Sequence, residues 1–316
     1  MHCMSKNIII LGAKGRFGRA ATTAFNDAGW TVRAFARKWE GDLPGSEIKF
    51  IKGDAFNKNE LLAAVKGCNI IVNALNPPYH RWQQDWPKLT SNVIDNAEIA
   101  GATILFPGNV YNYGRHMPCT LREDTTHAPT TRKGVLREEI EQSYVKASKR
   151  GVQTIILRAG DYIEKEKTGN WFDSFITPKI NRGIISYPGA TNVVHAWAYL
   201  PDMARAMVYL AEKKDKYRIF ESFGFPGFNI TGYELIKTIE EVLHRPLQVK
   251  QLPWSFMKLI ATVSPVVREV VEMRYLWDVP HAIDGTKLNT AIPEFRATSV
   301  DAALKSAISD SLDEAC

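Results

Sequence analysis

The sequence contains few cysteines, and they are not spaced as metal ligands. Four cysteines are scattered over 316 residues, at Cys3, Cys68, Cys119 and Cys316. Their separations match no cysteine-based metal site, so the sequence predicts no bound metal. Cys68 stands beside a predicted buried strand, and we expect it to be a reduced core residue of a cytoplasmic protein.

Long apolar runs and runs of like charge are also absent. The most apolar late segment, residues 254–271, is interrupted by Lys258, Pro265, Arg268 and Glu269, so it predicts two amphipathic helices and no membrane span. A role at a membrane surface is the weaker alternative. The net charge of +6 suits anionic ligands, but no Lys/Arg run marks a nucleic-acid-binding tail.

The predicted partner is therefore a small-molecule substrate and not a nucleic acid, and a homodimer is left open. An apolar strand starts within the first ten residues, which leaves no room for a signal peptide. This agrees with the expected cytoplasmic location.

The most informative local pattern is a glycine-rich turn between a strand and a helix. The apolar run 7–11 predicts a buried strand, Gly12, Gly15 and Gly18 follow it, and apolar residues recur at helical spacing over 17–28. In this context the first glycine permits a tight turn, the second admits a pyrophosphate and the third packs the helix on the strand. The helix N-terminus then attracts the phosphates; the alternative is a plain turn without ligand. The predicted cofactor-binding residues of the turn are Gly12, Lys14, Gly15, Arg16, Phe17 and Gly18.

Basic residues at the end of the second strand favour NADP over NAD. The position about twenty residues beyond the turn is Arg37, and no acidic residue occurs there until Glu40. A carboxylate at this place accepts the ribose hydroxyls, whereas a basic residue accommodates a 2′-phosphate. Arg16 adds a second positive charge on the same side. In the alternative interpretation, Arg37 is a solvated strand end.

Strands and helices alternate regularly along the first half of the chain. This pattern predicts an α/β fold of the Rossmann type, a doubly wound parallel sheet with a smaller C-terminal substrate lobe. We assign residues 1–160, with core elements from about 190–222, to the NAD(P)-binding domain. Residues 161–190 and 223–316 are assigned to the smaller lobe.

Ligands of such a sheet lie beyond the carboxyl ends of its strands. Asp54 is placed to accept from the adenine amino group, although it or Asn57 could instead cap the next helix. The remaining predicted cofactor contacts also follow strands and are Ala55, Ala74, Leu75, Asn76 and Pro107.

Several motifs resemble the extended short-chain dehydrogenase/reductase superfamily, which includes NAD-dependent epimerases and dehydratases. Besides the turn, they are Gly53-Asp54, Val110-Tyr111 and Glu123-Asp124-Thr125, and the resemblance covers essentially the whole chain. In that family a tyrosine and a lysine four residues later perform proton transfer. Here Lys133 stands at the tyrosine position and Arg137 at the lysine position. Asn109 stands where the family has a serine.

The Lys-x-x-x-Arg string is similar to the atypical isoflavone-reductase-like and NmrA-like branch. A lysine at this place is the acid/base in reductases of that branch, while NmrA-like members bind the dinucleotide as sensors. Lys133 would need a lowered pKa, which partial burial or the nearby Arg137 cation would favour. It could also stabilise charge or bind the ribose. Alternatively, residues 132–141 form a solvated helix face in which Arg137 pairs with Glu141.

These residues give three functional hypotheses. The first is an NADP(H)-dependent oxidoreductase that acts on a small carbonyl, alcohol or sugar-like compound. The second is a non-catalytic NAD(P) sensor, and the third is a sugar-nucleotide epimerase or dehydratase with Tyr111 or Lys133 as base. The catalytic candidates are Lys133, Tyr111 and Asn109. The substrate-contact candidates, for which packing is the alternative role, are Tyr113, Trp171 and His195.

Overall fold

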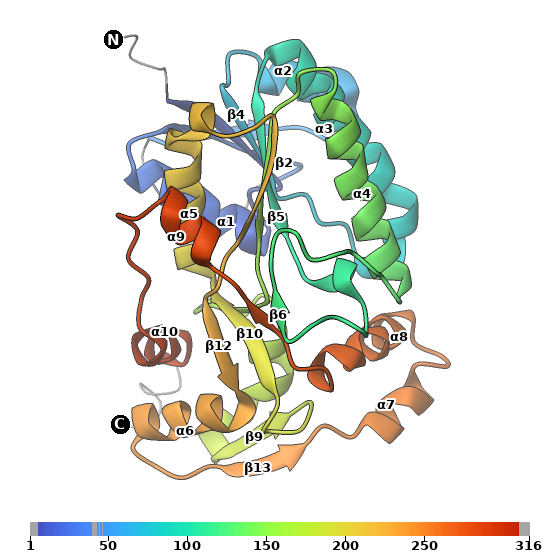
Figure 1. Cartoon of the computed structure of the whole chain (residues 1–316), viewed down its shortest axis with the longest axis vertical. Helices are drawn as coiled ribbons and strands as arrows, with labels where there is room; N and C mark the ends of the chain where they lie inside the picture. Colours follow the sequence, from blue (N-terminus) through green and yellow to red (C-terminus); the bar gives the residue numbers. More distant parts are fainter. Residues whose placement is uncertain (1–5, 40–42, 44, 46, 310–316) are drawn as a thin grey trace.

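A seven-stranded parallel sheet forms the centre of the computed structural model (Figure 1), which describes all residues except 1–5, 40–42, 44, 46 and 310–316. The strand order is β11-β7-β5-β4-β1-β2-β3, and every neighbouring pair is parallel. Chain order reverses between β1 and β4, as a doubly wound sheet requires. The strands are β1 (Asn7–Leu11), β2 (Thr31–Ala36), β3 (Lys49–Lys52), β4 (Ile70–Asn73), β5 (Thr103–Gly108), β7 (Thr154–Arg158) and β11 (Phe220–Gly224).

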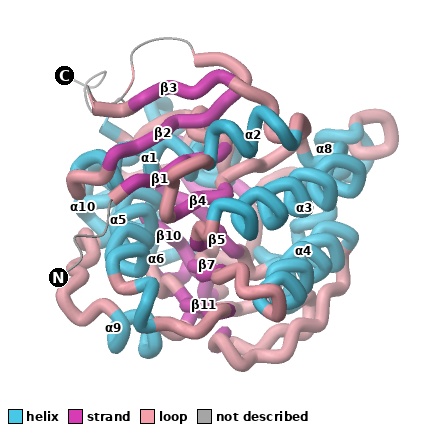
Figure 2. Tube along the Cα trace, turned by 90° about the horizontal axis from the view of Figure 1, so that it is seen from above, coloured by secondary structure: helices cyan, strands magenta, loops and turns pink. Residues whose placement is uncertain are grey.

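Helices cover both faces of this sheet (Figure 2). On one face α1 (Arg16–Asp27) packs against α5 (Leu200–Glu212). On the other face α3 (Trp82–Ala100) packs against α2 (Lys58–Val65) and α4 (Arg132–Ser148). Each face buries its own apolar cluster, so the central strands read as continuous apolar runs such as Ile8–Leu11.

A smaller lobe follows the carboxyl ends of the strands and contains a third apolar cluster. Its sheets are formed by β8 (Asp161–Ile163), β10 (Val194–Tyr199) and β12 (Phe228–Thr231), and by β9 (Ile184–Tyr187) with β13 (Gln248–Gln251). Its helices are α6 (Gly232–Leu243), α7 (Trp254–Ile260), α8 (Pro265–Glu272) and α10 (Val300–Ala307). The remaining elements are β6 (Thr120–Leu121), β14 (Ala282–Ile283), α9 (Thr286–Ala291) and the short helices at Tyr79–Arg81, Tyr111–Tyr113, Phe172–Ile176, Ile180–Arg182, Lys214–Lys216 and Met273–Trp277.

The predicted α/β fold with a smaller lobe is confirmed. The segment 254–271 forms two helices, as its interrupted apolar pattern indicates, and Cys68 is buried. Cys119 is exposed with a free thiol, whereas Cys3 and Cys316 lie outside the described residues. The domain boundaries stay a prediction. β10, from the 190–222 stretch assigned to the main domain, pairs with β8 and β12 and not with the central sheet.

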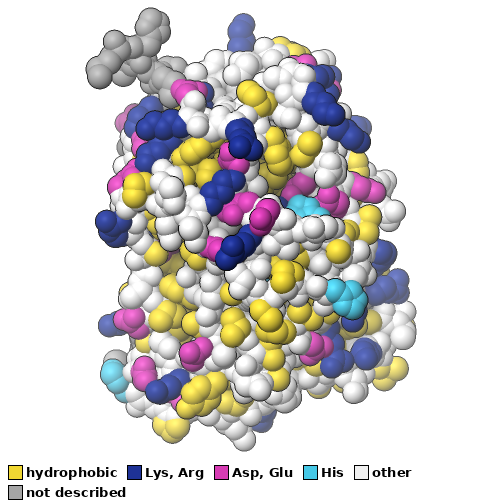
Figure 3. Space-filling model, in the orientation of Figure 1, with side chains coloured by type: hydrophobic (Ala, Val, Ile, Leu, Met, Phe, Trp, Pro, Cys, Tyr) yellow, Lys and Arg dark blue, Asp and Glu magenta, His cyan; other side chains and the backbone are white. Residues whose placement is uncertain are grey.

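Basic and acidic side chains are interspersed over the face shown in Figure 3. No helix in the described part of the chain combines the length and the apolar character that crossing a membrane requires. Within the same residues, no group of three histidine, cysteine, aspartate or glutamate side chains is arranged to hold a metal ion.

A buried ion pair joins α4 to the central sheet. Arg158 lies at the end of β7, and the two terminal nitrogens of its guanidinium donate to the Glu141 carboxylate at 3.0 and 2.6 Å. Arg158 is 4% exposed and Glu141 3% exposed. Such a desolvated pair becomes costly when one partner is removed, because the other charge remains buried.

Glu141→Gln is therefore expected to lower the free energy of unfolding by about 3 kcal/mol, since it leaves the Arg158 charge without a counter-ion. Urea denaturation measures the change. The matched control is Glu139→Gln on the exposed face of the same helix, which should change stability by less than about 0.5 kcal/mol. Equal stabilities of the two variants would contradict this account.

The buried His281 predicts a loss of stability in acid. Burial, helped by the nearby His195 ring, lowers the pKa of His281 from 6.5 to about 3. Below pH 6.5 the imidazole is therefore protonated in the unfolded chain but stays neutral in the native state. The free energy of unfolding falls as the pH drops from 6.5 towards 3.

Between pH 7.5 and 5.0 this group should remove about 2 kcal/mol from the free energy of unfolding. His281→Gln should show a correspondingly smaller loss over that range. His116→Gln, which changes an exposed histidine, should keep the wild-type dependence. If all three proteins lost the same amount, the buried neutral imidazole would not be the cause.

Candidate cofactor and active site

The glycine turn between β1 and α1 has the close backbone approaches that its sequence predicts. Gly12 adopts φ +74°, and a Cβ there would lie 2.8 Å from the Ala74 carbonyl oxygen. A Cβ on Gly18 would lie 2.2 Å from the Gly12 carbonyl oxygen. A larger residue at either position would displace the turn or the helix, so α1 begins directly against β1 only because these residues are glycine.

The first turn of α1 is left open for an anion. Its N-cap is Gly15, no side chain caps it, and the first turn contains no acidic residue. The leading N–H groups of a helix have no partner within the helix. Together with the helix dipole they form the phosphate-binding end that the sequence predicts. Lys14 and Phe17 flank this end, and Phe17 is buried.

The two basic residues assigned to the 2′-phosphate have different environments. Arg16 donates to the Thr168 side chain at 2.6 Å and to the Thr168 carbonyl at 3.0 Å, and it lies 3.1 Å from the Glu164 carboxylate. Its guanidinium thus joins the glycine turn to the loop that follows β8. Arg37 is exposed at the end of β2, and no described residue forms a hydrogen bond or ion pair with it.

The other predicted cofactor residues follow the ends of β3, β4 and β5. Asn57 caps α2, so that role is not taken by Asp54, whose carboxylate accepts from the Phe56 amide at 3.0 Å. Ala74 is buried beside Gly12. Ala55 is buried, and the Leu75 amide donates to the Asn73 side chain. The other two predicted positions at these strand ends are Asn76, in the loop after β4, and Pro107, within β5.

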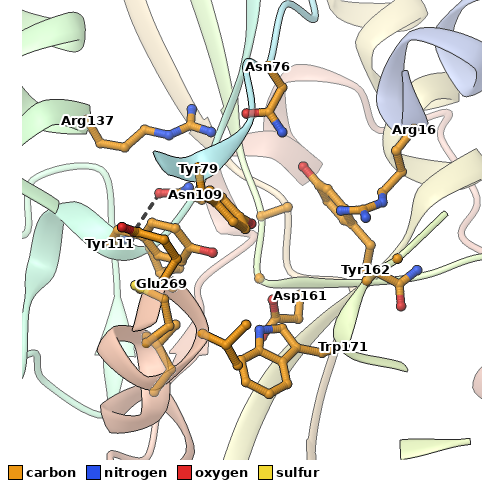
Figure 4. A pocket seen from close by; sticks show the side chains of 18 of the residues that line it. Arg16, Asn76, Tyr79, Asn109, Tyr111, Arg137, Asp161, Tyr162, Trp171 and Glu269 are labelled. Atoms are coloured by element: carbon orange, nitrogen blue, oxygen red, sulfur yellow. Dashed lines mark hydrogen bonds between the residues drawn. The ribbon is translucent and has the colours of Figure 1, made fainter. Parts of the chain in front are cut away.

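A cavity of about 910 Å³, part of it open to solvent, lies between these strand ends and the smaller lobe. Arg16 lines it together with side chains from the loops after β4, β5 and β7 and from α8. Figure 4 shows Arg16 and Arg137 entering from opposite sides, with Trp171 at the base. The structure brings five predicted residues together here, namely Arg16, Asn76, Asn109, Tyr111 and Trp171, and adds Tyr79, Asp161 and Glu269.

Tyr111 is one of three tyrosines that line the cavity, together with Tyr79 and Tyr162. Its amide donates to the Asn109 side chain at 3.1 Å, which holds the loop after β5 in place. Burial raises the pKa of Tyr111 well above its ordinary value, and the Tyr79 hydroxyl acts in the same direction. The phenol therefore keeps its proton at neutral pH. Tyr113, by contrast, is not among the cavity-lining residues, and its hydroxyl donates to the Arg122 carbonyl at 3.3 Å.

Lys133 is buried and does not line the cavity. Its Nζ donates to the Glu269 carbonyl at 2.9 Å and to Glu272 at 3.0 Å, and it also forms an ion pair with the Glu269 carboxylate. In this arrangement Lys133 connects α4 to α8, and Glu269 stands between it and the cavity.

The alternative interpretation of residues 132–141 as a solvated helix face is wrong. Lys133, Arg137 and Glu141 are 3%, 8% and 3% exposed. The proposed Arg137–Glu141 pair is wrong as well, because Arg158 occupies that carboxylate. Helical spacing indicates which residues share a face but does not reveal that α8 and β7 approach this face and supply the partners.

His195 is buried and does not line the cavity, but it contacts Asp161, which does. Its Nε2 lies 2.8 Å from Asp161 Oδ2, and its ring stacks on Trp277 with centroids 4.1 Å apart. Asp161 itself lines the cavity. Sequence reasoning missed Asp161 and Tyr79, although both follow strands of the central sheet, where ligands of this fold are expected.

Comparison with known proteins agrees with this geometry. The family model described as NAD(P)H-binding matches residues 12–182, more than half of the chain. No curated protein matches the sequence. Solved structures share the fold at low identity, so they support the architecture and not a particular activity.

Three of these solved structures are examples of proteins that share the fold. L-threonine dehydrogenase from Clostridium difficile has a TM-score of 0.76 at 18% identity and covers 98% of both chains. UDP-glucose 4-epimerase from Brucella ovis in complex with NAD has a TM-score of 0.75 at 13% identity, and the match covers 97% of this chain and 98% of the epimerase. MoeE5 in complex with UDP-glucuronic acid and NAD has a TM-score of 0.74 at 17% identity, and the match covers 98% of this chain and 100% of the MoeE5 chain.

The matched family model, the glycine turn on an open helix N-terminus and the doubly wound sheet lead to one assignment. The chain belongs to the NAD(P)H-binding family, and it has the Rossmann fold of the short-chain dehydrogenases/reductases and NAD-dependent epimerases/dehydratases.

Proposed function

We propose that the protein is an NADP(H)-dependent oxidoreductase that acts on a small carbonyl or alcohol compound. The observation that carries the proposal is a cavity that begins at Arg16, beside the phosphate-binding turn, and contains the protonated phenol of Tyr111. A dinucleotide on the turn would extend along the strand ends into this cavity. The proposal includes a cytoplasmic location and the domain division given above.

In this proposal Tyr111 is the proton donor. When bound, the reduced nicotinamide supplies a hydride to the substrate carbonyl carbon. The Tyr111 hydroxyl gives its proton to the carbonyl oxygen. A phenol carries its proton at neutral pH, and burial raises the pKa of Tyr111 further. Asn109 fixes the Tyr111 backbone. Lys133 holds α8 as the opposite wall through Glu269 and Glu272, and Trp171 lines the substrate side.

The preference for NADP rests on Arg37. Of the two basic residues assigned to the 2′-phosphate, Arg16 is engaged by Thr168 and Glu164. Arg37 is exposed at the strand end that meets the adenosine ribose in this fold. A guanidinium there offers paired donors to a phosphate.

An NAD(P) sensor is the second candidate, because the lysine at the family's tyrosine position is bound by two carboxylates. A sugar-nucleotide epimerase or dehydratase is the third, since epimerases share the fold. Consumption of NADPH with a panel of aldehydes, ketones and keto-sugars separates the first candidate from the second. A sensor would bind NADPH, detected by its fluorescence, without oxidising it in the presence of any compound.

Tyr111→Phe should reduce kcat at least about 100-fold with whichever compound is turned over, because the proton donor is lost. The Kd for NADPH should stay within a factor of two. Tyr113→Phe removes a hydroxyl from the same loop but outside the cavity, and it should retain activity. If Tyr111→Phe kept wild-type kcat, another group would have to supply the proton.

Arg37→Ser should lower the preference for NADPH over NADH about tenfold, as loss of one charged hydrogen bond predicts. Fluorescence titration with each dinucleotide gives the two Kd values. The control is Arg218→Ser, which removes the same charge from an exposed site before β11, at the opposite ends of the strands. If the ratio of the Kd values for NADH and NADPH were unchanged in Arg37→Ser, the basis for proposing NADP as the cofactor would be lost.

A further inference from the structure

Arg137 is a buried cation without a counter-ion. It is 8% exposed, and no described carboxylate lies within ion-pair distance of it. Its one hydrogen bond to a described residue runs from Nη1 to the Pro107 carbonyl at 3.3 Å. The Nε–H is buried without any partner. A guanidinium has five N–H donors, so most of this group's capacity is unused.

Arg158 provides a comparison inside the same molecule. It is buried to a similar extent, yet its guanidinium binds both oxygens of Glu141 and the Asn109 carbonyl. The protein therefore neutralises one buried arginine completely and leaves the other with a single carbonyl. Burying an unpaired charge costs several kcal/mol, and burial accordingly lowers the pKa of Arg137.

Aromatic rings hold Arg137 in place from the protein side. Its Cζ lies 4.1 Å from the ring centre of Trp86, 5.2 Å from that of Trp82 and 5.4 Å from that of Phe106. These contacts supply cation–π stabilisation. They accept no N–H bond in the plane of the guanidinium, so they fix its orientation without satisfying its donors.

The open side of Arg137 faces the cavity. The residue lines it, and its guanidinium points inward beside Asn76 and Asn109 (Figure 4). The other basic lining residue, Arg16, has its own carboxylate in Glu164. Of the acidic lining residues, Glu269 is paired with Lys133 and Asp161 with His195. Arg137 is thus the charge in the described cavity wall that lacks an opposite partner.

We propose that Arg137 is the anion-binding residue of the substrate site, and that the substrate carries a carboxylate that this guanidinium binds. This inference rests on the proposed function, because it takes the cavity as the substrate site. A planar carboxylate would accept paired N–H donors and supply the missing negative charge. The cofactor's phosphates are the competing source of an anion, but their predicted place is the open end of α1.

The test compares lactate with its neutral isostere lactamide, both titrated into protein saturated with NADPH and followed by saturation-transfer NMR. NADPH and lactate are both the reduced partners, so no turnover interferes. Lactate should bind at least 10-fold more tightly than lactamide. In Arg137→Met the two should bind equally. In Arg137→Lys, which keeps the charge but not the paired donors, the preference should be intermediate.

Three controls keep the outcome decisive. Lys149→Met removes an exposed charge just after α4 and should keep the wild-type preference. The urea midpoint of Arg137→Met should not fall below that of wild type, because the variant removes an unpaired buried charge; a large drop would indicate a structural role and overturn the proposal. NADPH affinity, measured separately, should be unchanged in Arg137→Met.

Equal binding of lactate and lactamide to the wild type would also overturn the proposal. So would lactate binding that occurs in the free protein and disappears when NADPH is saturating, because the anion site would then belong to the cofactor. Failure of NADPH to bind at all would instead contradict the proposed function, so the two failures are distinguishable.

Discussion

The bidentate pair between Glu141 and Arg158 determines the charge arrangement around the cavity. It connects α4 to the end of β7 and fixes the loop after β5 through the Asn109 carbonyl. Because the Glu141 carboxylate binds Arg158 bidentately, it forms no ion pair with Arg137 one turn earlier on the same helix. The position of one carboxylate therefore decides which of two buried arginines is structural and which remains open to a ligand.

The other charges near the cavity follow the same rule of local pairing. Lys133 is paired with α8, Arg16 with the loop after β8, and Asp161 with His195. The first two pairs join the smaller lobe to the main domain, whereas the third lies within the smaller lobe. What remains unpaired in the described wall is one guanidinium, next to a phenol that keeps its proton. Such a combination suits a substrate with an anionic group and a carbonyl to be protonated.

Much of the architecture could be predicted from sequence because local patterns determine it. The glycine turn depends on backbone approaches that only glycine permits, and Gly12 and Gly18 show them in the structure. Apolar strands such as β1 and the capping box at Thr231 are also local signals. The site was less predictable, since Arg137 and Lys133 obtain their surroundings from α3 and α8, which are distant in sequence. Spacing along α4 alone is equally consistent with a solvated face and an Arg137–Glu141 pair, and the structure shows that both are wrong.

The account as a whole requires that a dinucleotide bound at the glycine turn reaches the cavity. A crystal structure with NADP(H) bound tests this requirement most directly. We expect the pyrophosphate on the first-turn amides of α1, and the nicotinamide inside the cavity, leaving space for a substrate carbon about 3.5 Å from its C4 and within reach of the Tyr111 hydroxyl. A nicotinamide lying outside the cavity, or a pyrophosphate bound away from α1, would contradict the account.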